Sequence, residues 1–379
     1  MRNIIIDVCF WLYVTEKFTT IEFLLSPNCN LTCKYCYQKN DIPEVQNARD
    51  FHSQGGVVAS QEIIDKFIKF VTSEGIRFVI FYGGEPLLMW NTIKYIVNEI
   101  SKIDSLVKFS MVTNGTLLNN NIIDFISKNN FSMVLSLDGN KERQDSMRGG
   151  FEKISKWFQI LSKMNEKVEI NIQAAKIKGL YENAIRYVWS QGLRKINLNM
   201  IEDYGWYNSE DVRLFEKEYE KAINGMLNDE GILKDVLRIY NLLKAQSYEK
   251  SCGVTDIGLS MDWHGDFYPC VKGYELGKKY SIGNVWSGID ERSEQYVRSA
   301  ASKAYSSESS GIYQFVEYCP IEIYKKTNTF EGEWNSNYAK MLEVKQMLVG
   351  KYYKELHQFV QFHSHDSTVN YDASTDFFW

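Results

Sequence analysis

Three cysteines near the N-terminus, Cys29, Cys33 and Cys36, stand in the spacing C-x3-C-x2-C. Thiolates are the ligands of iron–sulfur clusters, and a 4Fe–4S cluster normally takes four of them. Three thiolates can hold three corners of one cluster and leave the fourth iron without a protein ligand. Such an open position can bind the amine and carboxylate of a small molecule, as catalytic zinc keeps a position free for substrate. The alternatives are a zinc loop or buried unreactive cysteines, although zinc loops usually show paired C-x2-C units.

The other cysteines of the seven are dispersed: Cys252, Cys270 and Cys319 form a loose late group, and Cys9 stands alone. Because no secretion signal is visible, the thiols are expected to stay reduced, and grouped thiols then more often bind metal than form disulfides. Cys9 is expected to be a buried core thiol. Further donors near the late group are Asp256, Asp262, His264 and Asp266, of which Asp262 and Asp266 are the candidates for a catalytic role.

Composition limits the classes of partner. The chain has 379 residues, of which 44% are hydrophobic and 24% charged, as in an ordinary globular protein with one large domain and a smaller attachment. A net charge of −5 without a basic stripe argues against nucleic acid. The apolar stretch 4–14 is too short to span a membrane and lacks a basic leader, so we expect no membrane association and a cytoplasmic location.

The elements that must position the cysteines alternate between strand and helix from residue 18 onward. Strands are predicted at 19–25, 77–82, 107–112, 132–137, 167–174 and 195–200, and helices at 60–72, 91–102, 120–128, 151–164 and 181–191. The continuous apolar run 77–82 predicts a strand buried on both faces. Six βα units with a parallel sheet indicate an α/β fold, a partial, open (β/α)6 TIM-like barrel whose site lies at the carboxyl ends of the strands.

The pattern of predicted strands, helices and turns divides the chain into five segments. These are an N-terminal strand segment 1–17, the partial barrel 18–205, a helical linker 206–250, a small α+β domain 251–345, and a C-terminal helix and tail 346–379. Residues 208–248 are expected to form a helix pair. His363 and His365 lie in the polar tail, where a mobile segment is the better interpretation than a site.

The cysteine motif, with the aromatic Tyr35 before its last cysteine, resembles that of the radical SAM enzymes. FYGGEP, TNGT and LSLDG with MRG follow successive predicted strands as in that family, so the resemblance covers roughly 18–205. It implies a 4Fe–4S cluster on the three cysteines that reductively cleaves S-adenosyl-L-methionine to methionine and a 5′-deoxyadenosyl radical. Gly83 and Gly84 would allow close backbone approach to the ligand, and Glu85 would accept a hydrogen bond from its ammonium.

The resemblance also implies roles for polar residues at the strand ends. Ser136 and Arg148 resemble the pair that binds the methionine carboxylate, for which a planar guanidinium is well suited. Tyr35 is expected near the adenine, and Asn114 and Gln173 are candidates for ribose contacts. For Ser136, Asn114 and Gln173, an ordinary polar residue at a strand end is an equal alternative.

The segment from Cys252 to Cys270, followed by YSIGNVW, resembles the SPASM and shorter twitch extensions, which bind auxiliary iron–sulfur clusters. Cys319 resembles a remnant of the later SPASM cysteines. A full SPASM domain has seven cysteines, so the resemblance implies one auxiliary iron–sulfur cluster here. The alternative is that the late cysteines are structural thiols. Sulfatase-maturing relatives are expected to carry Asp where this chain has Val271, which disfavours that particular activity.

The extension implies a ribosomally made peptide as substrate, on which the enzyme makes a cross-link, an oxidation or an epimerisation. An electron donor such as flavodoxin or ferredoxin is implied as a partner. Because only 28 residues precede Cys29, a separate leader-peptide-binding protein or direct recognition is expected. Two alternatives are a radical SAM enzyme acting on a small-molecule cofactor precursor and a non-catalytic metal-binding interaction protein.

Overall fold

The computed structural model describes residues 18–39, 57–201, 206–229, 254, 258–302, 319–330 and 336–352. The predictions for 1–17, for Cys9, Cys252 and Asp256, for the second helix of the linker and for the tail histidines concern residues outside these ranges. No helix among the described residues is long and apolar enough to cross a membrane.

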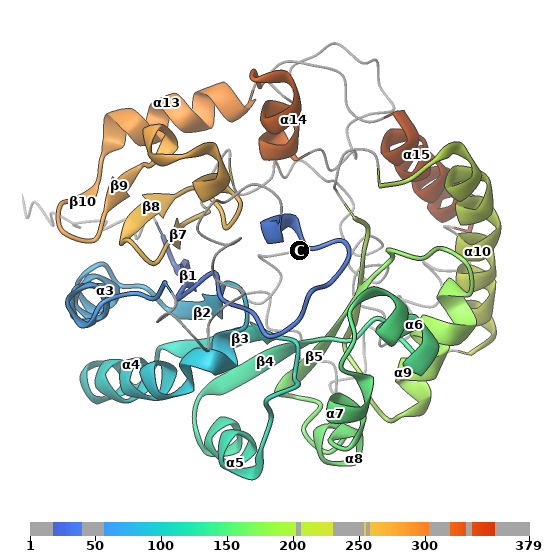
Figure 1. Cartoon of the computed structure of the whole chain (residues 1–379), viewed down its shortest axis with the longest axis horizontal. Coiled ribbons are helices and arrows are strands. Elements are labelled where there is room, and N and C mark those ends of the chain that lie inside the picture. Colours follow the sequence, from blue (N-terminus) through green and yellow to red (C-terminus); the bar gives the residue numbers. More distant parts are fainter. Residues whose placement is uncertain are drawn as a thin grey trace, which may run out of the picture.

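Six parallel strands form the curved centre of the molecule (Figure 1). They are β1 (Thr20–Leu24), β2 (Phe78–Tyr82), β3 (Lys108–Thr113), β4 (Phe131–Ser136), β5 (Val168–Gln173) and β6 (Ile196–Asn199). Each pairs in parallel with the next, as the alternation of strand and helix predicts. The α/β fold and the partial barrel are confirmed.

Helices cover the outer face of these strands (Figure 1). They are α3 (Gln61–Ser73), α4 (Trp90–Ile103), α5 (Asn120–Lys128), α6 (Lys141–Met147), α7 (Phe151–Ser155), α8 (Phe158–Leu161) and α9 (Tyr187–Ser190), with a 3-10 helix η2 (Pro86–Met89) before α4 and a π-helix η3 (Leu180–Arg186) before α9. The core fills the space between sheet and helices. Phe67 of α3 packs on Phe23, with ring centroids 4.4 Å apart.

The burial of β2 differs from the prediction that residues 77–82 form a strand buried on both faces. Val79 and Phe81 are fully buried against the helices, whereas Phe78, Ile80 and Tyr82 are only half-buried. Burial therefore alternates along β2 and is not equal on its two faces. The reason is that six strands do not close the barrel, so the inner face of the sheet is not filled as completely as the outer one.

Two predicted helices are interrupted. The range 151–164 contains α7 and α8 as separate short helices, and 181–191 begins as the π-helix η3. The helix α6 was not predicted, because its sequence KERQDSM has no apolar period. Its N-cap residue is Asn140, whose side chain accepts a hydrogen bond from the Arg143 N–H at 3.0 Å.

The C-terminal part extends the same sheet beyond β1. The strand β7 (Ser260–Met261) pairs in parallel with β1, and β8 (Asp266–Tyr268), β9 (Gly283–Asn284) and β10 (Gly288–Ile289) follow in antiparallel order. The resulting ten-stranded sheet has the order β10-β9-β8-β7-β1-β2-β3-β4-β5-β6. The segment after Gly258 is therefore joined to the barrel by main-chain hydrogen bonds.

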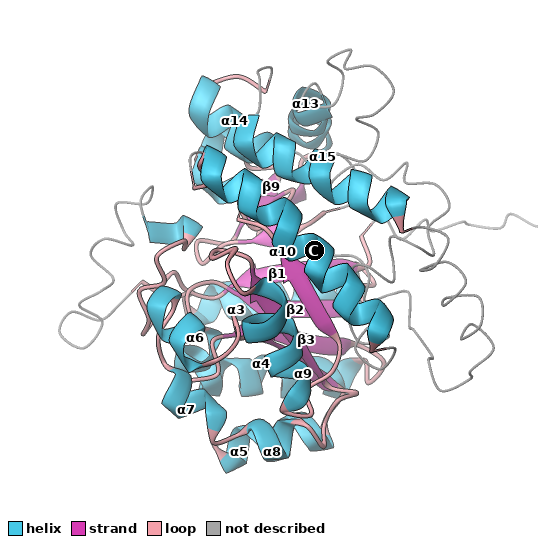
Figure 2. Cartoon of the chain, turned by 90° about the vertical axis from the view of Figure 1, so that its right-hand side faces the viewer, coloured by secondary structure: helices cyan, strands magenta, loops and turns pink. Residues whose placement is uncertain are grey.

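Further helices lie around the opening of the barrel. They are the 3-10 helices η1 (Tyr37–Lys39), η5 (Gly273–Leu276) and η6 (Lys278–Tyr280), and α10 (Ser209–Asn228), α13 (Glu291–Ser302), α14 (Pro320–Thr327) and α15 (Ser336–Lys351). Figure 2 shows α10 and α15 side by side. The Lys351 ammonium pairs with Glu220 at 2.6 Å and so joins these two helices.

Candidate active site

The three N-terminal cysteines lie in the loop that follows β1, at the carboxyl edge of the sheet. Cys33 is buried, and Cys29 and Cys36 are partly exposed. The loop is held by main-chain contacts, including a hydrogen bond of 2.8 Å from the Lys34 N–H to the carbonyl of Met147 at the end of α6. The loop therefore has a fixed backbone course although it contains little regular structure.

Gly83 and Gly84 bring the loop after β2 against this cysteine loop. The Gly84 N–H donates to the Ser26 carbonyl at 2.9 Å, and a Cβ at Gly84 would lie 2.0 Å from the Asn28 carbonyl oxygen. Gly83 has φ +128°, a conformation that side chains disfavour. The glycines are thus required for packing of one loop on another, whatever contact they also make with a ligand.

The three thiols influence one another. Burial is the largest reason that the pKa of the Cys29 thiol rises to about 12. The Glu85 carboxylate and the other two cysteines raise it further, because each adds negative charge nearby. The raised pKa means that Cys29 favours its protonated thiol form. Bound iron would instead favour the thiolate, since a cation stabilises negative charge on sulfur. Among the described residues, no three ligand-type side chains converge on the position of a single metal ion.

Glu85 is completely enclosed and already carries three hydrogen bonds. Its Oε1 accepts from the Thr113 hydroxyl at 2.6 Å and from the Leu87 N–H at 3.0 Å, and its Oε2 accepts from the Asn114 N–H at 2.7 Å. Burial raises its pKa, and these hydrogen bonds oppose the rise. A carboxylate offers roughly four acceptor positions, so one remains for a ligand donor. Glu85 therefore joins β2 to the loop after β3 in addition to any role toward an ammonium.

Asp138, which the sequence analysis did not single out, lies at the centre of the polar contacts after β4. Its carboxylate accepts a hydrogen bond from the Tyr35 hydroxyl and one from the Gln173 N–H at 3.2 Å. Arg148 lies 3.6 Å from the same carboxylate, and its guanidinium carbon is 5.3 Å from the centroid of the Tyr35 ring. Asp138 thus joins the cysteine loop, the end of α6 and the end of β5. The motif LSLDG contained the residue but not its partners.

The remaining candidates for contacts with a ligand are Asn114, Ser136 and Gln173. Asn114 donates to Asn30 at 2.9 Å and toward the Cys29 sulfur at 3.9 Å, and its side-chain oxygen accepts from Thr116. Its amide is therefore engaged with the cysteine loop, and a ribose contact would require an exchange of partners. Ser136 is buried at the end of β4, and Gln173 is half-buried at the end of β5. Their ligand roles stay predictions.

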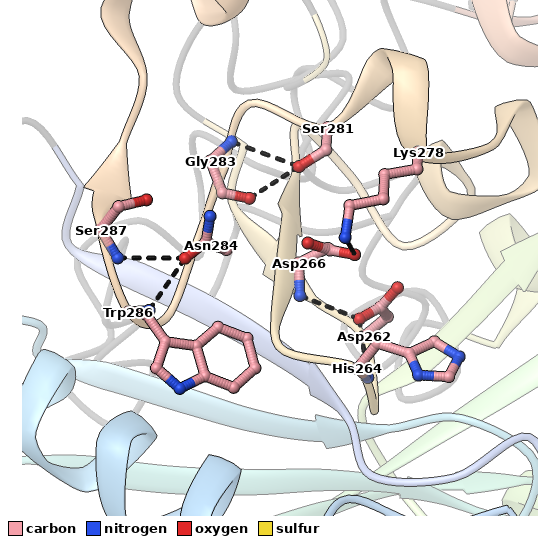
Figure 3. Close-up of polar contacts among 9 residues, drawn as sticks. All are labelled: Asp262, His264, Asp266, Lys278, Ser281, Gly283, Asn284, Trp286 and Ser287. Atoms are coloured by element: carbon pink, nitrogen blue, oxygen red, sulfur yellow. Dashed lines mark hydrogen bonds and ion pairs between the residues drawn. The ribbon is translucent and has the colours of Figure 1, made fainter.

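The late cysteines lie in the C-terminal part of the chain. Cys270 follows β8 and is partly exposed, and the buried Cys319 precedes α14 as its N-cap residue. Asp262 and Asp266 belong to the hairpin β7–β8 (Figure 3). Asp262 accepts from the His264 and Asp266 N–H groups at 2.9 and 3.0 Å, which fixes the hairpin turn. Burial raises its pKa to about 6.

Asp266 pairs with the exposed Lys278 at 3.3 Å (Figure 3). Both hairpin aspartates are thus engaged within the C-terminal part of the sheet. Their catalytic role stays a prediction, and a structural role in the turn is already visible.

A family model matches the part of the chain that contains the cysteine loop. Residues 23–186 match the family model of the Radical SAM superfamily. This segment is therefore similar to radical SAM domains, and the loop of three cysteines after β1 lies within it. Radical SAM domains work with a 4Fe–4S cluster and S-adenosylmethionine.

Two curated proteins and one solved structure illustrate the similarity. The radical SAM cyclopropyl synthase TigE of Paramaledivibacter caminithermalis is 23% identical over 80% of this chain and 67% of its own length. The cysteine-type anaerobic sulfatase-maturating enzyme of Clostridium novyi is 33% identical over 40% of this chain and 43% of its own length, so that match spans less than half of the relative. Native anSMEcpe with bound AdoMet and Kp18Cys peptide has a TM-score of 0.68 at 18% identity, covering 90% of this chain and 99% of that one.

The residues present fit the cofactors of such a domain. The cysteine loop offers three thiol donors, and Glu85 keeps an acceptor position open. The Nε of Arg148 is buried without a hydrogen-bond partner in the described structure, so a donor is available beside the cysteines. A buried donor of this kind calls for an acceptor such as a carboxylate.

Proposed function

We propose that this protein uses Cys29, Cys33 and Cys36 to hold a 4Fe–4S cluster, cleaves S-adenosylmethionine there, and modifies a ribosomally made peptide. The observation that carries the first part is the presence of three thiols on one loop, near two buried groups of opposite charge, Glu85 and Arg148, in the segment that matches the radical SAM family model. These groups match an ammonium and a carboxylate, the two charged ends of a methionine moiety.

Cys29, Cys33 and Cys36 would hold the cluster, which would supply the electron for reductive cleavage of S-adenosylmethionine to methionine and a 5′-deoxyadenosyl radical. The chain's own residues bind and orient the substrate. Glu85 accepts a hydrogen bond from the ammonium, and Arg148 donates from its unpartnered Nε to the carboxylate. Tyr35 packs beside the adenine, held by Asp138. Ser136, Asn114 and Gln173 are the further polar residues around this position.

The peptide substrate is supported by the relatives. A sulfatase-maturating enzyme is among the similar curated proteins, and anSMEcpe has been solved with a bound peptide. The likeness to anSMEcpe extends over 90% of this chain, so it includes the C-terminal part as well as the barrel. We propose that Cys252, Cys270 and Cys319 hold one auxiliary iron–sulfur cluster there. Within this proposal a flavodoxin or ferredoxin supplies electrons, and a separate protein binds the leader peptide.

The cleavage reaction is tested by anaerobic reconstitution of the full chain with iron and sulfide, followed by reduction and assay of 5′-deoxyadenosine. Cys33→Ala should abolish cleavage, because two thiolates do not hold the cube. Cys9→Ala, which removes a thiol outside both groups, serves as the matched control and should retain cleavage. Undiminished cleavage by Cys33→Ala would refute the assignment of the cluster.

The peptide step is tested with short peptides encoded beside the gene. Mass spectrometry should show a product that depends on S-adenosylmethionine, with a loss of hydrogen or a change of stereochemistry at one residue. Modification of a small molecule while all such peptides stay unchanged would instead support the cofactor-precursor alternative. Metal binding without any cleavage would support the non-catalytic alternative.

A further inference from the structure

Glu22 is a buried carboxyl group that the reactions described above do not use. It lies in the middle of β1, and only 4% of the residue is exposed. Phe23 packs against Phe67 of α3, so the alternation of the strand directs the neighbouring Glu22 to the opposite face, into the barrel. Its carboxyl group accepts a hydrogen bond from the Val271 N–H, and in the described part of the chain no cation pairs with it.

Three further side chains accompany Glu22, and together the four are called the junction cluster: Glu22, Tyr82, Tyr37 and Lys272. The register of β1 and β2 puts Tyr82 on the same face of the sheet as Glu22, and the two groups interact electrostatically. Tyr82 is hydrogen-bonded to Tyr37. The Lys272 ammonium lies 5.5 Å from the centroid of the Tyr37 ring.

The junction cluster lies where the two cysteine segments meet. Tyr37 directly follows Cys36, and Lys272 comes two residues after Cys270. Glu22 contacts the second segment through Val271. The junction cluster therefore connects the segment after Cys36 with the segment after Cys270.

The charged groups around the junction cluster are mostly engaged with one another. Lys272 pairs with Glu322 of α14 at 3.1 Å, and Lys325 pairs with Glu275 at 2.7 Å. From β7, the register partner of Glu22 is the uncharged Ser260, and Asp262 follows two residues later at the hairpin turn. Toward Glu22 itself, the neighbouring titratable group is the phenol of Tyr82.

The surroundings of the Glu22 carboxyl group raise its pKa above the ordinary value of a glutamate. Burial raises the pKa of its carboxyl group to about 8, and the hydrogen bond from Val271 opposes this rise. A group that titrates near the working pH both accepts and releases protons readily. A purely structural acceptor for the Val271 N–H would not need a carboxyl group, because the glutamine amide oxygen accepts equally well.

We propose that Glu22 transfers a proton to or from a substrate group that enters between the two cysteine segments. This inference rests on the proposed function. In the acceptor direction, a heteroatom–hydrogen bond of the substrate breaks, an O–H bond forms at the Glu22 carboxylate, and the electron pair stays on the heteroatom. In the donor direction, the O–H bond of the Glu22 carboxyl group breaks and the proton returns to the substrate.

The proposal is tested by comparing Glu22→Gln, Glu22→Asp and the wild type, each as the full reconstituted chain with the gene-neighbour peptide that the assay described above finds to be modified. Product formation and 5′-deoxyadenosine are measured together across a pH range that brackets the Glu22 pKa of about 8. General acid–base catalysis contributes typically 10²–10⁴-fold, so Glu22→Gln should lower product formation by about a hundredfold or more and remove the inflection near that pH. Glu22→Asp should restore part of the activity with a displaced inflection. Wild-type yield or an unchanged pH profile in Glu22→Gln would overturn the proposal.

A second measurement does not depend on the peptide. Infrared difference spectra of the wild type should show the carbonyl band of a protonated carboxyl group that disappears as the pH rises through about 8 and that Glu22→Gln lacks. If no tested peptide is modified but this band titrates as stated, the peptide part of the proposed function fails, whereas the protonated state of Glu22 that proton transfer requires is supported. If the band is absent at neutral pH, the proposal for Glu22 fails whatever the substrate. Iron content and melting temperature of each variant show whether it has folded.

Discussion

The Tyr35 hydroxyl donates a hydrogen bond to the Asp138 carboxylate, which joins the cysteine loop to the end of β4 across 103 residues of sequence. Asp138 is buried and Tyr35 is partly buried, and Arg148 lies over the Tyr35 ring and beside Asp138. The order of the cysteine loop therefore depends on Asp138, a residue that lies outside the cysteine motif.

Asp138→Asn should weaken S-adenosylmethionine binding by about ten- to a hundredfold, because a hydrogen bond to a charged group contributes roughly 1.5–3 kcal/mol. The variant leaves Arg148 without its buried anion and weakens the contact of Tyr35. Equilibrium binding of S-adenosylmethionine to the reconstituted protein measures the effect, with iron content as the control. Asp145→Asn on the exposed side of α6 is a matched comparison and should bind normally. Equal affinities of the two variants would contradict the role of Asp138.

Glu85→Ala should lower both stability and affinity. It leaves the buried donors of Thr113 and Asn114 without their acceptor, and an unsatisfied buried group costs roughly 1–3 kcal/mol. Binding of S-adenosylmethionine should fall by about ten- to a hundredfold from the loss of the charge-assisted contact. Thermal unfolding and ligand titration separate the two effects. A loss of stability with unchanged affinity would show that GGEP is a structural turn only.

Gly84→Ala should prevent normal assembly of the cysteine loop, because the added Cβ would lie 2.0 Å from a backbone oxygen of Asn28 and backbone does not yield easily. The expected result is a loss of reconstituted iron with most of the fold retained in the circular dichroism spectrum. Gly350→Ala in α15 is the matched control, since nothing lies within 4 Å of its added Cβ. Full iron content in Gly84→Ala would show that the two loops can separate without consequence.

The buried Glu22 should make stability depend on pH even without cofactors. Its pKa is raised from 4.5 to about 8 on folding, so between these values the folded protein keeps a proton that the unfolded chain has lost. The free energy of unfolding should therefore fall as the pH rises, by up to about 1.4 kcal/mol per pH unit, and this contribution is fully present only below 4.5. Urea unfolding of the wild type and of Glu22→Gln at several pH values measures the difference. Parallel pH profiles of the two proteins would exclude the shift.

Replacement of Cys252, Cys270 and Cys319 together by Ala should roughly halve the iron content while retaining some cleavage of S-adenosylmethionine, since the 4Fe–4S cluster proposed for the N-terminal cysteines does not need the late cysteines as ligands. Product formation should fail. Iron and sulfide analysis of the anaerobically reconstituted proteins provides the measurement. The triple variant retaining full iron content, or wild type reconstituting with only about four irons, would contradict an auxiliary cluster.

The sequence by itself determined the barrel and the cysteine motif. Apolar runs such as 77–82 and the helical period of 60–72 are local patterns, and the cysteines of the motif are neighbours in the chain, so their spacing is readable without a structure. The helix α6 was not predicted because its largely polar sequence shows no helical repeat of apolar residues. Its N-cap at Asn140 was the available signal.

Only the tertiary structure decided which polar groups accompany the cysteines. Asp138 and Tyr35 are far apart in sequence, and Glu22 looks like an ordinary polar position in an alternating strand until β7 pairs with β1 and encloses it. That pairing also brings Val271 to the Glu22 carboxyl group. Parallel strand pairing depends on long-range hydrogen bonds and on how far a sheet closes, and neither is encoded in a local run of residues.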